Sequence, residues 1–110
     1  MNEDEIKTLP SGAATSGNLP PYECLTPLFL RRSAERMRLG LRYGKHNWKK
    51  GIEDKEFILN RLNHAFEHLI LAMEAIDSDT PVSDDNLAAV VVNCMFAMEY
   101  EAHAHPSSET

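Results

Sequence analysis

The chain has 110 residues, a formal net charge of −6 at neutral pH and an apolar fraction of 43%. These values predict one domain with an ordinary core, and they argue against a general binder of extended nucleic acid. Two cysteines are too few for a disulfide scaffold or a four-cysteine metal site, and no apolar run is long enough to span a bilayer. Because the acidic N-terminus has no apolar signal core, we expect a cytoplasmic location and no membrane partner.

The first 21 residues are polar and contain three prolines and two glycines. They have little to bury, so residues 1–21 are expected to form a flexible polar arm. A helical domain then covers residues 22–104, and residues 105–110 form a frayed tail. No segment shows a strand pattern as strong as the helical patterns that follow.

The first helix is expected to begin after Thr26, a good N-cap, with Pro27 at the first helical position. It runs to about Leu39 and stops near Gly40 or Gly44, since glycine commonly ends a helix.

Eight of the eleven Lys and Arg residues lie between residues 31 and 50. A local basic patch on an acidic protein suits a small anionic ligand better than a long polyanion. The simpler alternative is a helix face joined by salt bridges, for example between Arg32 and Glu35.

The second helix is expected to run from Glu53 or Asp54 to about Ile76. Apolar residues recur at steps of three and four and should share one buried face: Ile58, Leu62, Ala65, Leu69, Met73 and Ile76. The opposite face is polar and is either exposed to solvent or lines a cleft: Asn60, His64, Glu67, Leu71 and Glu74, with His68 at its edge.

The third helix is expected to start after Ser83, its cap, with Asp84 and Asp85 in its first turn. Residues 87–98 are apolar nearly all round, interrupted only by Asn93, so this helix should be buried on several sides. The fold class is therefore all-α: a small helical bundle with three main helices, completed by homo-oligomerisation.

The stretch from Arg42 to Gly51 holds the densest cluster of aromatic, basic and turn-forming residues. Its aromatic side chains can stack on a flat ring, its cations can meet phosphate oxygens, and its glycines let the backbone bend. These are Tyr43 and Trp48; Lys45, His46, Lys49 and Lys50; and Gly44 and Gly51. The alternative is a solvated loop whose single tryptophan packs on the core.

Acidic residues form a second candidate site. Glu67 and Glu74 lie on one helix face, and Asp79 follows in the connection, so carboxylates at one end of the bundle can hold Mg²⁺ or Mn²⁺. Acids that serve the helix ends are the simpler interpretation. Asn93, in an apolar helix, needs a hydrogen-bond partner, which is either a core group or a ligand.

Several short motifs follow one another along the chain: LPSGA at residues 9–13, YGKHNWKKG at residues 43–51 and HL at residues 68–69. An acidic connection and a helix with a buried Asn come after them. In this order the chain resembles the small phage and bacterial proteins called dATP/dGTP diphosphohydrolases, which look like relatives of MazG-type all-α nucleotide pyrophosphohydrolases. The resemblance covers most of residues 9–101, and its Tyr-Gly-x-x-Asn-Trp-x-x-Gly core is the most specific part. It carries over to Tyr43, Gly44, Asn47, Trp48, Gly51, His68, Leu69, Asp79, Leu87, Ala88 and Asn93.

The resemblance implies metal-dependent hydrolysis of a deoxynucleoside triphosphate in the cytoplasm, the host cytoplasm if the protein is phage-encoded. Catalytic roles are expected for Glu67, His68 and Asn93, and metal binding for Glu67, Glu74 and Asp79; of these, the resemblance carries over His68, Asp79 and Asn93, and the two glutamates are chosen for their positions on the second helix. The residues expected to bind substrate are Tyr43, Lys45, Asn47, Trp48, Lys49 and Lys50.

The sequence departs from the family pattern at three positions. The family's Arg before His is Glu67, and two histidines of the last helix are Asn86 and Ala89. The alternative is therefore a catalytically degraded relative that binds a nucleotide signal or a host protein without hydrolysis.

Overall fold

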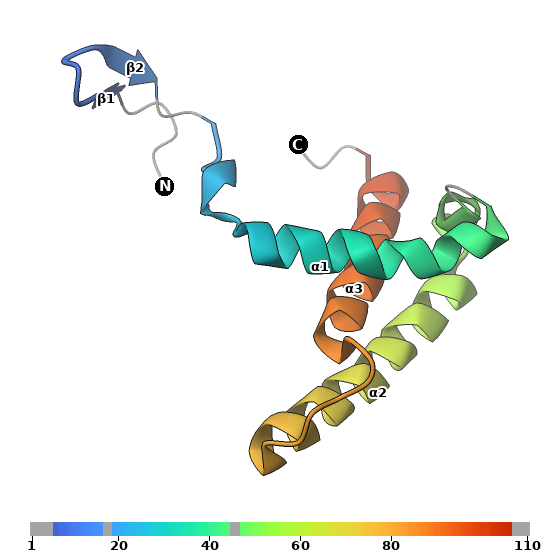
Figure 1. The fold of residues 1–110 in the computed structure, drawn as a ribbon. Coiled ribbons are helices and arrows are strands. Elements are labelled where there is room, and N and C mark those ends of the chain that lie inside the picture. The colour runs from blue at the N-terminus through green and yellow to red at the C-terminus, as the bar shows by residue number, and fades with distance from the viewer. Residues whose placement is uncertain (1–5, 17–18, 45–46, 107–110) are drawn as a thin grey trace.

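A computed structural model describes residues 6–16, 19–44 and 47–106 of the chain. Three α-helices form the main body: α1 (Pro27–Met37), α2 (Lys55–Ser78) and α3 (Asn86–Ala104). Figure 1 shows α1 and α2 crossing the central helix α3. The predicted all-α class with three main helices is confirmed.

The 3₁₀ turn η1 (Tyr22–Cys24) precedes α1, and two more, η2 (Arg38–Tyr43) and η3 (Asn47–Gly51), lie between α1 and α2. The N-terminal arm contains an element that the sequence pattern did not predict. Strands β1 (Ile6–Thr8) and β2 (Ala14–Ser16) pair antiparallel, with Ile6 opposite Ser16, and their hairpin stands away from the helices (Figure 1).

The ends of α1 and α2 follow their local signals. Thr26 caps α1 by accepting a hydrogen bond from the amide of Phe29, and Pro27 occupies the first helical position, as predicted. Asp54 caps α2 by accepting from the amides of Glu56 and Phe57. These caps satisfy amide groups that have no partner within the helix itself.

The cap predicted for α3 was wrong by two residues. Asp85, not Ser83, accepts the hydrogen bond from the amide of Ala88, and the helix begins at Asn86. Ser83, Asp84 and Asp85 are all good capping residues, so local preference alone could not choose among them.

The core is small and centres on α3. Ile58, Val92 and Phe96 are buried together, and partly buried apolar side chains pack against them. α3 contacts both α1 and α2, which confirms that the helix without a polar face is the central one.

The predicted buried face of α2 was only partly right. Ile58 and Ala65 are buried, but Met73 is 62% exposed and Ile76 68% exposed. Ala72, which was not predicted, is buried on α2 together with Ala65, and Ala88 and Ala89 are buried on α3, the helix that α2 contacts. Small side chains allow two helices to approach closely, so the larger apolar residues of α2 are left on the outside.

The molecule is open rather than compact. Its radius of gyration is 18.1 Å, whereas a compact chain of this length has a value of about 13 Å. In the described residues, no helix is both long enough and apolar enough to cross a membrane.

Candidate functional site

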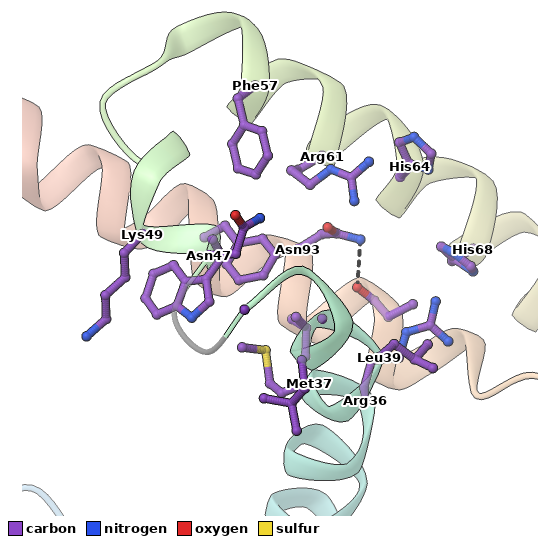
Figure 2. Close-up of a pocket in the computed structure, with 17 residues that line it drawn as sticks. Arg36, Met37, Leu39, Asn47, Lys49, Phe57, Arg61, His64, His68 and Asn93 are labelled. Atoms are coloured by element: carbon purple, nitrogen blue, oxygen red, sulfur yellow. Dashed lines mark hydrogen bonds between the residues drawn. The ribbon is translucent and has the colours of Figure 1, made fainter.

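A cavity of about 750 Å³ lies where the end of α1, the turns η2 and η3, the first half of α2 and the middle of α3 meet (Figure 2). Its volume is typical of small-molecule sites. This cavity is therefore a candidate binding site.

Gly44 lines this cavity, and Gly51 contacts Phe57, which also lines it. Gly44 has a φ of 102°, in the region that favours glycine. At Gly51 an added Cβ would overlap the ring of Phe57, so the turn η3 can approach α2 only because this residue has no side chain. The predicted backbone role of both glycines thus has a physical basis.

Trp48 joins the loop to the core. Its ring stacks on Phe96, with centroids 5.3 Å apart and planes inclined by 23°. The ammonium of Lys49 lies 5.7 Å from the centre of the Trp48 ring, a cation–π distance. Trp48 is half-buried and also lines the cavity, so it both packs on the core and faces the candidate site.

The cavity lining is basic. Arg36, Lys49 and Arg61 contribute cations, His64 and His68 contribute imidazoles, and no described Asp or Glu lies in the lining. Arg36 is paired with Asp84, which lies outside the lining, whereas Lys49 and Arg61 have no carboxylate partner among the described residues and favour an anionic ligand.

Arg61 is only partly hydrogen-bonded. Its Nη2 donates to Asn60 Oδ1 at 2.9 Å, and its guanidinium carbon lies 5.8 Å from the centre of the Phe57 ring. Its Nε is buried and has no hydrogen-bond partner among the described residues. An unsatisfied buried donor costs about 1–3 kcal/mol. Figure 2 shows Arg61 and Phe57 projecting from α2 toward the side of the cavity that holds Asn93.

Arg36 links the cavity to the start of α3, because it forms an ion pair with Asp84. Arg32, one turn earlier, pairs with Asp85. Arg38 pairs with Glu35. The basic helix therefore does make salt bridges, but Arg32 reaches across to α3 rather than to Glu35.

Two polar side chains from α2 and α3 complete the lining. Asn93 is buried, and its Nδ2 donates to the carbonyl of Ala89 at 3.0 Å, so its partner lies in its own helix (dashed line, Figure 2). His68 Nδ1 lies 2.8 Å from Oδ1 of the buried Asn86.

The structure brings together five of the predicted site residues. All five line the cavity: Asn47, Trp48, Lys49, His68 and Asn93. Lys50 is exposed on η3 and is not part of the lining. The side chain of Tyr43, and all of Lys45 and His46, lie outside the described residues.

The predicted metal ligands lie elsewhere. Glu67 and Glu74 are exposed on α2. Asp79 follows α2 in a left-handed conformation, with φ 53°, and borders a second cavity of about 450 Å³. Within the described part of one chain, no three His, Cys, Asp or Glu side chains are placed to hold a metal ion.

The cavity lining also does not fit Mg²⁺, which takes oxygen ligands and is usually held by one or two carboxylates. The described lining offers cations and imidazoles but no carboxylate. A metal site built from Glu67, Glu74 and Asp79 stays a prediction that would need ligands from beyond one chain.

Sequence reasoning missed Arg36, Phe57 and Arg61 as lining residues. A signal for Arg61 was present, because it precedes His68 by seven residues and so lies on the same face of α2 two turns earlier. Phe57 lies one further turn along that face. Arg36 stood among several arginines of α1, and only the tertiary arrangement distinguishes it from its neighbours.

A protein-family model matches most of the chain. The model of the family described as dATP/dGTP diphosphohydrolase, N-terminal, matches residues 10–109, so the chain belongs to this family. No curated protein and no solved structure matched the chain.

Proposed function

We propose that the cavity binds a purine deoxynucleoside triphosphate and that the chain acts as a nucleotide pyrophosphohydrolase-like protein. The observation that carries this proposal is a cavity whose described lining contains Arg36, Lys49 and Arg61 and has no carboxylate. Membership of the dATP/dGTP diphosphohydrolase family supports this class of ligand.

The two parts of a nucleotide suit the two kinds of lining residue. Arg61, Arg36 and Lys49 can meet the phosphates, since guanidinium groups bind phosphate oxygens in a fixed fork. Trp48 and Phe57 offer ring surface for the base, and stacking on an aromatic side chain is worth about 1–3 kcal/mol per base.

In the proposed reaction, water attacks the α-phosphorus and the bond to the β-phosphate oxygen breaks. The products are a nucleoside monophosphate and pyrophosphate. Negative charge grows on the phosphate oxygens as this bond breaks, and cations already in place at Arg36 and Arg61 would stabilise that charge. No step is assigned to a metal, because the described lining does not fit one.

A second function is favoured by the same lack of carboxylates: capture of a nucleotide or nucleotide-derived signal without hydrolysis. Asn86 and Ala89, which stand where the family pattern has histidines, point in the same direction. A pyrophosphate-release assay with dATP and dGTP, in Mg²⁺, in Mn²⁺ and in EDTA, separates the two. Pyrophosphate release in any of the three conditions supports hydrolysis, whereas tight binding with no release in all three supports capture.

The working form is proposed to be a homo-oligomer. Large apolar side chains along the outside of α2 are exposed, and the chain is more extended than a compact domain. The exposed set is Leu59, Phe66, Leu69, Ile70, Leu71, Met73 and Ile76. Mass measurement in solution tests this: a Phe66→Glu variant should dissociate while Arg31→Glu, on the exposed surface of α1, should not, and a monomeric wild type at micromolar concentration would contradict it. A host protein that covers this face is the alternative occupant.

A further inference from the structure

The hydrogen bond between His68 and Asn86 ties the cavity wall to the first residue of α3. His68 Nδ1 lies 2.8 Å from Asn86 Oδ1, although the two residues are 18 positions apart. Asn86 is only 6% exposed. His68 lines the large cavity, whereas Asn86 borders the smaller one, so the pair stands between the two.

The chemistry of this contact sets the protonation of the imidazole. An amide oxygen only accepts hydrogen bonds, so Nδ1 must carry the hydrogen that is donated to it. In a neutral imidazole the other nitrogen, Nε2, then has a free lone pair. Since Asn86 occupies the Nδ1 side of the ring, Nε2 is the nitrogen left to accept a hydrogen bond in the cavity.

The backbone around Asn86 is held firmly in place. Asp85 caps α3 and pairs with Arg32 of α1, and Asp84 pairs with Arg36, itself a cavity residue. Three consecutive residues, Asp84 to Asn86, therefore fix side chains on both neighbouring helices. A support of this kind orients a site more accurately than a loop does.

We propose that Asn86 is a positioning residue that holds His68 in the Nδ1–H form and turns Nε2 into a hydrogen-bond acceptor for the ligand side of the cavity. The proposal rests on the proposed function in one respect: the donor that Nε2 meets is a sugar hydroxyl of the nucleotide or the water that attacks it. The tautomer itself is a property of the ligand-free protein.

Nitrogen-15 NMR of the histidine side chains tests the tautomer directly, at a pH of about 8, where a neutral imidazole predominates. His68 in the wild type should carry its hydrogen on Nδ1. Asn86→Asp, which keeps the acceptor oxygen, should retain that state, and Asn86→Leu, which removes it, should shift His68 toward Nε2–H. A wild-type His68 protonated on Nε2, or a tautomer unchanged in a folded Asn86→Leu variant, would overturn the proposal.

Nucleotide affinity supplies the functional readout. Asn86→Leu should weaken dATP or dGTP binding by about threefold to tenfold, the effect of one neutral hydrogen bond. Asn63→Leu, an exposed change on α2, is the control and should leave affinity within about twofold. Equal affinity in folded Asn86→Leu and wild type would contradict the role of Asn86. If the wild type binds neither nucleotide, the proposed function fails, but the tautomer measurement still stands.

Discussion

The carboxylate of Asp85 receives two hydrogen bonds from the guanidinium of Arg32, at 2.8 and 2.7 Å, and a third from the amide of Ala88. One side chain thus joins α1 to α3 and caps α3. Because Asp84 and Asn86 on either side of it hold Arg36 and His68, this contact fixes the geometry of one end of the cavity.

Substitutions at Asp85 should separate the cap from the ion pair. Asp85→Asn keeps a good N-cap and loses only the charge, so it should lower the free energy of unfolding by less than about 1 kcal/mol. Asp85→Ala loses both and should cost about 1–2 kcal/mol. Urea unfolding measures both values, and an Asp85→Ala variant as stable as the wild type would show that the contact contributes nothing.

The same contact predicts a pH dependence. The hydrogen bonds from Arg32 hold the pKa of Asp85 below its ordinary value, with a smaller contribution from the amide of Ala88, while burial opposes them. A carboxyl whose pKa is lower in the folded state stabilises the fold above the unfolded pKa, and this stabilisation is lost as the pH falls through the folded pKa. The stability difference between wild type and Asp85→Asn should therefore be constant near neutral pH and shrink in acid below about pH 4. A difference that grows in acid would have the wrong sign.

Trp48 is the only tryptophan in the chain, so its fluorescence reports on the cavity directly. Nucleotide binding next to its ring should change the emission. Trp48→Phe keeps an aromatic ring against Phe96 and should retain most of the stability, whereas Trp48→Ala should cost about 2–3 kcal/mol and weaken nucleotide binding. Unchanged affinity in a folded Trp48→Ala variant would exclude stacking on this residue.

Gly51 provides a steric test of the loop. Gly51→Ala should destabilise the protein by about 1–3 kcal/mol, because the new methyl group overlaps the Phe57 ring. Gly40→Ala is the matched control, since no atom lies within 4 Å of a Cβ built there. Phe57→Leu should relieve part of the cost in the double variant. Thermal unfolding should be measured for the wild type, Gly51→Ala, Gly40→Ala and the double variant Gly51→Ala/Phe57→Leu. Equal losses of stability in Gly51→Ala and Gly40→Ala would show that η3 does not pack on α2 in this way.

Local signals in the sequence predicted the elements well. Thr26 and Pro27 mark the start of α1 because capping and a fixed φ act within one turn. The apolar run of α3 predicted a central helix because a helix without a polar face has to be covered on several sides. The motif residues Asn47 and Trp48 were predicted as site residues, and both line the cavity.

The packing of the helices against one another was harder to predict from the sequence. The face of α2 that meets α3 uses Ala65 and Ala72, so following the largest apolar residues rotated the helix away from its true contact. Because the predicted face of α2 was rotated in this way, Arg61 was not predicted to line the cavity. It lies on the same side of α2 as Ala65 and Ala72. Hydrophobic periodicity predicts that a helix has a buried face, but close packing of small side chains decides which residues of the helix face its neighbour.

Arg61 therefore offers the most direct test of the central claim, that the cavity binds a nucleotide through its basic lining. Calorimetric titration with dATP and dGTP should compare the wild type, Arg61→Ala and Arg31→Ala, an exposed arginine of α1 outside the cavity lining. Loss of a charge-assisted contact worth about 1.5–3 kcal/mol should weaken binding by about 10- to 100-fold in Arg61→Ala, with Arg31→Ala within about threefold of the wild type. Equal affinities in the two folded variants would contradict the claim.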